Sequence, residues 1–208
     1  MSDKKTGYII AVISVFAGII AAVMASTVRF ENTCQQVRQN VLRLHVIANS
    51  DTDFDQTLKL KVRDRILSLG GELFDGSTDV KNAEEKLREQ KNMLEMEAEK
   101  LCRQEHTDYR VTVEVEDDIF PTRTYDTVTL PAGKYKAVKV TIGEGEGHNW
   151  WCVMFPPMCL PAAQEKTEIE DVINEGAVKL VTSDPKIEVR FKLVEWYQMA
   201  KNRLSSSN

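Results

Sequence analysis

The hydrophobic and polar positions divide the chain into an uncharged N-terminal run and a body with alternating and helical patterns. Residues 7–28 carry no charged side chain, and Lys4 and Lys5 precede them. At 1.5 Å of rise per residue a helix over this run is about 33 Å long, enough to cross a hydrocarbon core of about 30 Å. Residues 1–28 are therefore predicted to be a signal or transmembrane segment, with the basic end in the cytoplasm and the body outside.

The end of the apolar run also resembles a site at which a signal peptide is removed. Val23, Met24 and Ala25 precede Ser26, and this pattern suits a signal peptidase. Cleavage after Ala25 would release the body of the chain, whereas retention of the run would leave the body anchored by one helix. The sequence leaves both fates open.

The remainder of the chain shows the patterns of an α+β domain. Alternating positions predict strands over 41–47 and 109–115, a hairpin of 125–130 with 135–142 around the turn-forming residues 131–134, and a strand from Asn149. Helical spacing predicts helices from Asp51 to the pair Gly70-Gly71, and over 79–106, 165–181 and 186–204. We expect residues 29–204 to form one α+β domain whose mainly antiparallel sheet is packed by helices on one side, and residues 205–208 to form a disordered tail.

Composition and charge narrow the classes of function. With 42% hydrophobic and 28% charged residues, the chain has enough apolar material for a packed core and lacks the composition of a disordered protein. Its formal net charge of −5 argues against a nucleic-acid partner, because such binding needs a cationic surface that displaces counterions from phosphates.

Two motifs carry a resemblance to a known family. The first runs from Arg43 to Asp51 and continues over 58–64, and the second runs from Gly143 to Cys159. Both resemble signatures of the stage II sporulation protein R family, in the same order. With the apolar run before them and a helix containing Val194, Glu195 and Trp196 after them, the resemblance covers nearly the whole chain.

The resemblance implies a signal and not an enzyme. A protein of this family is expected to be made in the forespore and exported into the space between the two membranes of the developing spore. There a membrane-embedded aspartic protease of the mother cell senses it and processes the pro-sigma-E factor. The expected partners are this protease and the membrane, through the N-terminal helix. No cofactor and no nucleic-acid partner is expected.

A cluster of aromatic and proline residues in the second motif is the predicted surface for a partner. Strand alternation places Trp150 and Cys152 on one face of the sheet and Trp151 and Val153 on the other. We therefore expect one tryptophan to lie in the core and the other to be available to a partner. The predicted partner-binding residues are Trp150, Trp151, Phe155, Pro156 and Pro157.

A second hypothesis is an extracytoplasmic hydrolase that acts on the cell wall. His45 or His148 could serve as the base for a Cys152 nucleophile, and His148, Cys152 and Cys159 could instead ligate zinc. In an oxidising compartment Cys152 would rather pair with Cys159 in a disulfide, and a buried cysteine is more often inert packing. The three interpretations stay open at this point.

Two other patterns have simpler explanations than a ligand site. The glycines of 143–147 follow a strand but lead into Trp150 and not into a helix N-terminus, so the dipole and amide groups that bind phosphate are missing. Asp51, Asp53 and Asp55 alternate as calcium ligands do, but the loop glycine and terminal glutamate of an EF-hand are absent. Capping of the helix that follows explains these carboxylates more economically.

Overall fold

The structure is a computed structural model that describes residues 2–74, 77, 79–125, 128–156, 178 and 181. Its elements are α1 (Ser2–Gln39), β1 (Leu42–Ile47), α2 (Asp53–Leu73), α3 (Val80–Gln104), β2 (Val111–Phe120), β3 (Arg123–Tyr125), β4 (Val128–Leu130), β5 (Gly133–Ile142) and β6 (Asn149–Phe155). The prediction of an α+β fold with an N-terminal apolar helix is confirmed. Apart from Val178 and Val181, the helices predicted over 165–181 and 186–204 and the tail at 205–208 lie outside the described residues.

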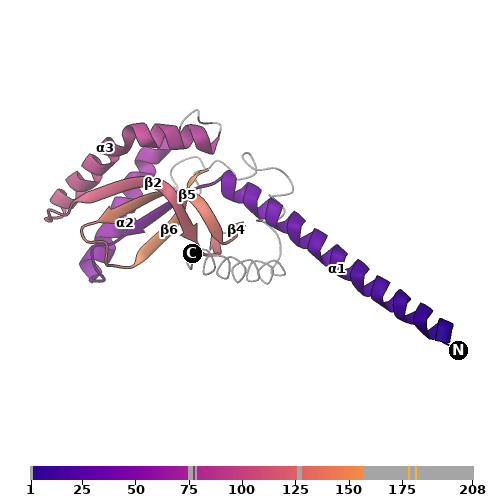
Figure 1. The fold of residues 1–208 in the computed structure, drawn as a ribbon. Coiled ribbons are helices and arrows are strands. Elements are labelled where there is room, and N and C mark those ends of the chain that lie inside the picture. Colours follow the sequence, from indigo (N-terminus) through magenta and orange to yellow (C-terminus); the bar gives the residue numbers. More distant parts are fainter. Residues whose placement is uncertain are drawn as a thin grey trace, which may run out of the picture.

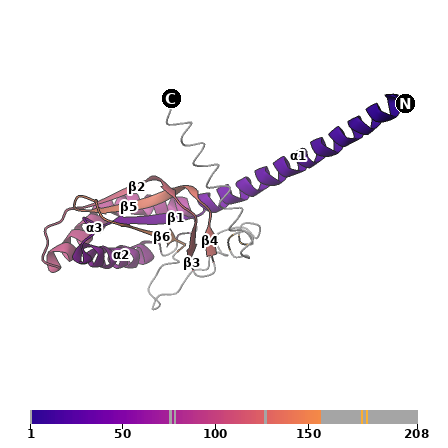
Figure 2. The same ribbon diagram turned by 90° about the horizontal axis from the view of Figure 1, so that it is seen from below.

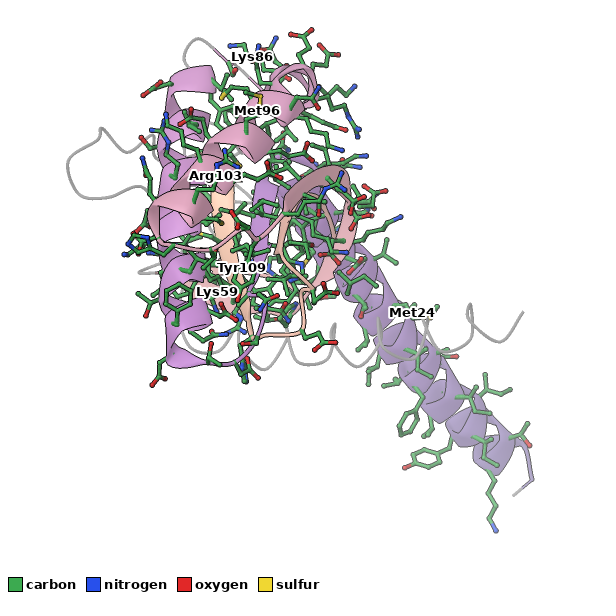
Figure 3. The ribbon with its side chains drawn as sticks, turned by 90° about the vertical axis from the view of Figure 1, so that its left-hand side faces the viewer. Met24, Lys59, Lys86, Met96, Arg103 and Tyr109 are labelled. Atoms are coloured by element: carbon green, nitrogen blue, oxygen red, sulfur yellow. The ribbon has the colours of Figure 1, made fainter. Side chains whose placement is uncertain are left out.

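The apolar N-terminal segment forms the outer part of α1, which projects away from the rest of the molecule (Figure 1). Within the described residues it is the one helix long and apolar enough to cross a membrane, either as a signal sequence or as an anchor. The Met24 side chain lies on the projecting part, well away from the domain (Figure 3). The helix does not end at Val28 as the apolar run suggested, because its last turns pack against the domain.

The inner end of α1 is fixed by buried contacts. Cys34 and Val37 are fully buried, and Arg38 donates from Nη2 to Glu31 Oε1 (2.5 Å) and from Nη1 to the Ala132 carbonyl (3.3 Å). Gly133 makes this approach of Arg38 possible, since a Cβ there would lie 2.6 Å from Arg38 Cδ. The apolar segment is therefore joined to the domain by one continuous, packed helix.

A four-stranded sheet in the order β2-β5-β1-β6 forms the centre of the domain. β1 is parallel to β5, whereas the other two pairings are antiparallel, so the sheet is mixed but mostly antiparallel. α2 and α3 cover one face (Figures 1 and 2). Their apolar positions pack with the valines of β1, β2 and β5 into the larger core. In this arrangement both ends of β1 lie next to other elements. The turn that follows β1 forms part of the site described below.

The other face of the sheet is also buried over part of its area, which corrects the expectation of a sheet packed on one side only. Phe120, Tyr135 and Val153 form a second core there, together with Val37 from α1 and Leu130 from β4. The expectation was wrong because this face carries polar residues of β1, which the alternation pattern assigned to solvent. In the structure these polar side chains are buried and bonded.

The predicted hairpin of 125–130 with 135–142 is wrong. β4 pairs with β3 in a separate two-stranded sheet, while β5 pairs with β2 and β1. The strand predicted over 109–115 continues to Phe120, because Lys134, Lys136 and Lys139 of β5 neutralise the carboxylates of its second half. An isolated acidic run is a poor strand, but opposite charges across a strand pair stabilise it.

The helix predicted to end at Gly70-Gly71 continues to Leu73 as α2. Gly70 lies inside the helix because a Cβ at that position would come within 2.5 Å of Met154 Cε on β6. The glycine therefore serves close packing between helix and sheet and does not end the helix. The start of α3 agrees with the prediction, since Asp79 accepts a hydrogen bond from the Asn82 amide as its N-cap (2.9 Å).

Cys34 and Cys102, the free thiols among the described residues, are expected not to react with a thiol reagent such as DTNB at pH 8 in the folded protein. Both are buried, and burial raises the pKa of Cys34 to about 12 and also raises the pKa of Cys102. Because the unfolded thiols ionise first, at a pKa of about 8.5, stability should fall as the pH rises above that value. Rapid labelling of either thiol without denaturant would contradict this prediction.

Candidate functional site

The two motifs that carry the family resemblance meet at one end of the domain. The glycine-rich loop of residues 143–147 lies against the turn of residues 48–51, and three hydrogen bonds join them. Gly147 N donates to the Ala48 carbonyl (2.9 Å), Glu146 N to the Asn49 carbonyl (3.1 Å), and Glu144 N to Asn49 Oδ1 (3.0 Å). Segments that are about a hundred residues apart in sequence thus form a single structural unit.

The glycines of this loop are required by its close approach to the turn. Gly143 and Gly145 have φ angles of 58° and 67°, in the left-handed region that favours glycine. A Cβ on Gly147 would lie 2.2 Å from the Ser50 carbonyl oxygen, which is a backbone atom that cannot move aside. The run is therefore a docking loop, and it leads into β6 and not into a helix.

The buried carboxylate of Asp55 fixes the turn of residues 48–51 through hydrogen bonds. Asp55 Oδ2 accepts from Ser50 Oγ (2.5 Å) and from Asn49 Nδ2 (2.9 Å), and Asp55 is 3% exposed. Burial opposes ionisation of Asp55, but the hydrogen bonds from Ser50 and Asn49 hold its pKa below the usual value. The Tyr109 hydroxyl lies beside the same carboxylate, and burial there raises the pKa of the phenol. Thr52, one residue before α2, is the N-cap of the helix.

His148 and Asp51 form a second link between the motifs, at the surface. Asp51 Oδ1 accepts from the His148 backbone amide (2.6 Å) and contacts His148 Nδ1. The hydrogen bond from the His148 ring holds the pKa of Asp51 below its usual value. Lys59 of α2 donates to the His148 carbonyl (2.9 Å), and its side chain lies at the same end of the domain as Tyr109 (Figure 3). The acidic trio thus contains one surface carboxylate that bonds to His148 and one buried carboxylate.

The two neighbouring tryptophans lie on opposite faces of the sheet, as alternation predicts. Trp150 is 37% exposed, and the Arg63 guanidinium of α2 lies 4.3 Å from its ring centroid. Trp151 is half-buried on the other face. Of the remaining predicted partner-binding residues, Phe155 and Pro156 are buried, and Pro157 lies outside the described residues. Trp150 is therefore the most exposed member of this set among the described residues.

His45 lies at the centre of a bonded network on the Trp151 face. Its ring stacks on Trp151 with 3.7 Å between centroids, and its Nδ1 and Nε2 lie 2.7 Å from Asp118 Oδ2 and 2.9 Å from Asn149 Oδ1. The network ties β1, β2 and β6 together.

Arg43 is a fully buried cation in an aromatic cage. Its guanidinium carbon lies 4.3 Å from the ring centroid of Phe120, 4.9 Å from that of Tyr135 and 5.4 Å from that of Tyr125. Nε donates to the Cys152 carbonyl (3.0 Å) and Nη2 to the Tyr125 hydroxyl (2.6 Å), whereas Nη1 has no hydrogen-bond partner. Burial lowers the pKa of Arg43. No carboxylate among the described residues balances this charge.

The structure does not bring the residues of the hydrolase hypothesis together. His45 and Cys152 lie on opposite faces of the sheet, because Cys152 is in register with Leu44 and not with His45. Four residues of extended chain separate His148 from Cys152 by about 13 Å. Cys152 is also disulfide-bonded, so in this form its sulfur is neither a free nucleophile nor a metal ligand.

The zinc hypothesis depends in part on Cys159, which lies outside the described residues. Within the described part of the chain, no group of three or more His, Cys, Asp or Glu side chains could hold a metal ion. Cys34 and Cys102 are free, so neither pairs with Cys152. The proposed pairing of Cys152 with Cys159 stays a prediction.

Sequence reasoning missed the polar residues that organise the site from within. Arg43 lies in the first motif, but its alternation with Leu42 and Leu44 suggested an exposed face. Asp118 lies in an acidic run that resembles a solvated surface. Arg43 and His45 lie in a short strand within the first motif. A strand at the centre of a sheet is buried on both faces, and this was the available signal that the two side chains are buried.

Comparisons with known proteins agree with the motif resemblance. The model of the stage II sporulation protein R family matches residues 38–165, a span that contains both motifs. The chain is 32% identical over 187 residues to stage II sporulation protein R of Bacillus subtilis (strain 168), and the alignment covers 80% of this chain and 84% of that protein. No solved structure matches the chain.

Proposed function

This chain belongs to the stage II sporulation protein R family, and from that premise we propose that it is an extracytoplasmic signal that activates a membrane-embedded aspartic protease. That protease would then process the pro-sigma-E factor. The observation that carries the proposal is the combination of this family with an apolar helix that continues directly into the folded domain. Such a helix delivers the domain to the far side of the membrane, in the intermembrane space of the developing spore, whether it is later cleaved or kept as an anchor.

An activator of this kind works by binding and not by chemistry. It must bind the active form of the protease more tightly than the inactive form, and a shift from 1:99 to 99:1 requires a difference of about 5.5 kcal/mol. The separation of His45, His148 and Cys152 described above gives the competing hydrolase hypothesis no assembled site in the described structure. The signalling role therefore accounts for more of the observed geometry.

We place the contact with the protease at the Trp150 surface, which consists of Trp150, Arg63, His148 and Asp51. The tryptophan ring is partly exposed and held by the cation of Arg63, while the His148–Asp51 pair fixes the adjoining loop. A large aromatic side chain on a rigid support binds a partner at little entropic cost. The surface combines residues of both family motifs.

Replacement of Trp150 by alanine should weaken activation without unfolding the protein. An aromatic hot spot contributes about 2 kcal/mol or more to binding, so we expect about a 30-fold loss of affinity and a matching loss of pro-sigma-E cleavage at limiting signal. The assay is cleavage of the precursor in a host without sporulation genes, in which signal, protease and substrate are produced together.

Phe54→Ala is the matched control, because Phe54 is a 46% exposed aromatic residue of α2 outside the Trp150 surface. It should activate as the wild type does. If wild type and Trp150→Ala activate equally over a range of expression levels, the contact lies elsewhere on the protein. If the wild-type chain fails to activate a protease that is present and intact, the proposed function is wrong.

A further inference from the structure

The two halves of the outer edge of the sheet differ in whether side chains of α3 bind the strand backbone. β2 is an edge strand, since it pairs with β5 on one side only. Three side chains of α3 bind backbone atoms along its first half: Glu99 Oε1 accepts from Val111 N (3.3 Å), Glu95 Oε1 from Val113 N (2.9 Å), and Arg88 Nη2 donates to Val115 O (3.0 Å). These contacts close the first half of the edge to other strands.

The second half of the edge has no such cover from α3. The register of β2 with β5 is unbroken from Val111 to Phe120, so Asp117 and Ile119 direct their backbone groups outward just as Val115 does. Among the described residues, no side chain of α3 bonds to the backbone of Asp117 or Ile119. The Ile119 amide donates to Asp118 Oδ1 (2.7 Å), and a segment that pairs there must displace this contact. The Ile119 side chain is also 55% exposed.

This open half of the edge lies in a cleft of about 1000 Å³. One wall is the inner end of α1, with Glu31 and Gln35. The opposite wall is the first turn of α3, and the floor contains Asp117 and Ile119. The cleft therefore presents outward-pointing backbone groups and an apolar side chain between two helices. An extended peptide that joins an exposed sheet edge needs these features.

The position of the cleft along α1 defines which segments can reach it. Gln35 lies seven residues beyond Val28, where the apolar run ends, and this is about 10 Å of helix. Glu31 is about 5 Å from the same point. Since α1 is continuous and packed onto the domain, the cleft is held close to the membrane surface whenever the apolar segment spans the bilayer. A segment that binds there must itself lie next to a membrane.

We propose that this cleft binds an extended segment adjoining a membrane helix of a membrane-embedded partner, and that the segment pairs with β2 at Asp117 and Ile119. The inference rests on the proposed function, which supplies a partner of this kind. Main-chain hydrogen bonds to β2 provide the affinity, and an apolar side chain of the segment packs on Ile119. The interaction adds a second contact, nearer the membrane than the Trp150 surface.

Two substitutions should block the cleft without disturbing the fold. Ile119→Lys places a charge at the exposed edge position, which is how natural edge strands prevent pairing. Gln35→Trp fills the cleft from the exposed side of α1. The matched controls are Thr112→Lys, at an exposed position of the same strand, and Asn32→Trp, at an exposed position of the same helix, and neither residue lines the cleft.

The test uses the full chain produced with the membrane protease and its pro-sigma-E substrate. We expect Ile119→Lys and Gln35→Trp each to reduce cleavage at limiting signal at least tenfold, and both controls to stay within twofold of wild type. A photo-reactive p-benzoylphenylalanine at position 119 should crosslink to a protease peptide that adjoins one of its membrane helices, and the same group at position 112 should not.

The outcomes separate this inference from the proposed function. If wild type activates and the cleft variants activate equally well, or if the crosslink at position 119 falls far from any membrane helix, the cleft proposal is wrong while the signalling role stands. If wild type does not activate at all, the proposed function fails and the cleft proposal fails with it. Melting temperatures of the purified variants within 3 °C of wild type would exclude unfolding as the cause of any loss.

Discussion

Replacement of Arg43 by alanine is expected to lower the free energy of unfolding by about 3–5 kcal/mol. Truncation of a long, fully buried side chain leaves a cavity, and comparable core truncations cost about 2–5 kcal/mol. The change also removes the donors to the Cys152 carbonyl and the Tyr125 hydroxyl, and each buried group left unpaired costs about 1–3 kcal/mol. Some relaxation of the cage should keep the total below the sum. Urea denaturation followed by circular dichroism measures the loss.

Arg43→Met separates packing from charge in the same position. Methionine keeps much of the volume inside the ring cage and removes a buried cation that no described carboxylate balances. Replacement of buried charges by apolar residues of similar volume is often neutral or stabilising. We therefore expect Arg43→Met to be more stable than Arg43→Ala by about 2 kcal/mol. Equal stability of wild type and Arg43→Ala would show that the cage does not depend on the guanidinium.

Gly147→Ala is expected to detach the glycine-rich loop from the turn of residues 48–51 and to cost about 2–3 kcal/mol of stability. The added Cβ would lie 2.2 Å from the Ser50 carbonyl oxygen, so the loop must move and its bonds to Ala48 and Asn49 must lengthen or break. The amides of Glu146 and Gly147 should then exchange with solvent much faster. Hydrogen exchange read by NMR, together with urea denaturation, measures both effects.

Gly18→Ala is the control for this substitution. Gly18 lies in α1 with no atom within 4 Å of an added Cβ, so alanine there should leave the stability of the domain unchanged. Slow exchange of the Glu146 amide in Gly147→Ala would contradict the docking of the loop. Because the loop supports His148 in the Trp150 surface, we also expect Gly147→Ala to weaken activation of the protease.

Some elements could be predicted from the sequence because the pattern of their own residues determines them. β1, α3 and β6 follow from alternation, helical spacing and the Asp79 cap, and the opposite placement of Trp150 and Trp151 follows from the period of a strand. The apolar segment was equally plain, because no charge interrupts it. These features depend on neighbouring residues in the chain and not on contacts between distant segments.

Features that depend on distant partners could not be predicted in the same way. The pattern around 131–134 is typical of a hairpin, yet β4 pairs with β3, because β5 finds partners in β2 and in the remote β1. Gly70 resembles a helix end in the sequence, yet in the structure it lies inside α2 and packs against Met154 of β6. Arg43 resembles a surface residue until the aromatic rings of three other strands surround it. In each case the deciding contact lies far away in sequence.

The candidate site also combines features that follow from local sequence with features that depend on distant contacts. The sequence located the two motifs and predicted that one of Trp150 and Trp151 is available to a partner. The docking of the motifs through the turn and loop backbone is a tertiary contact without a sequence signature. The hydrolase hypothesis was reasonable from composition, since His45, His148 and Cys152 all lie within the motifs. Only the register of β1 with β6 reveals that His45 and Cys152 lie on opposite faces of the sheet.

Whether this chain switches on a protease can be decided by following the processing of pro-sigma-E. Pro-sigma-E is produced in a host without sporulation genes, with and without this chain, and with either the active protease or a variant that lacks a catalytic aspartate. Processing of the precursor is followed by immunoblot. The proposed function predicts processing only when this chain and the active protease are present together. Equal processing without this chain, or processing with the inactive protease, would contradict it.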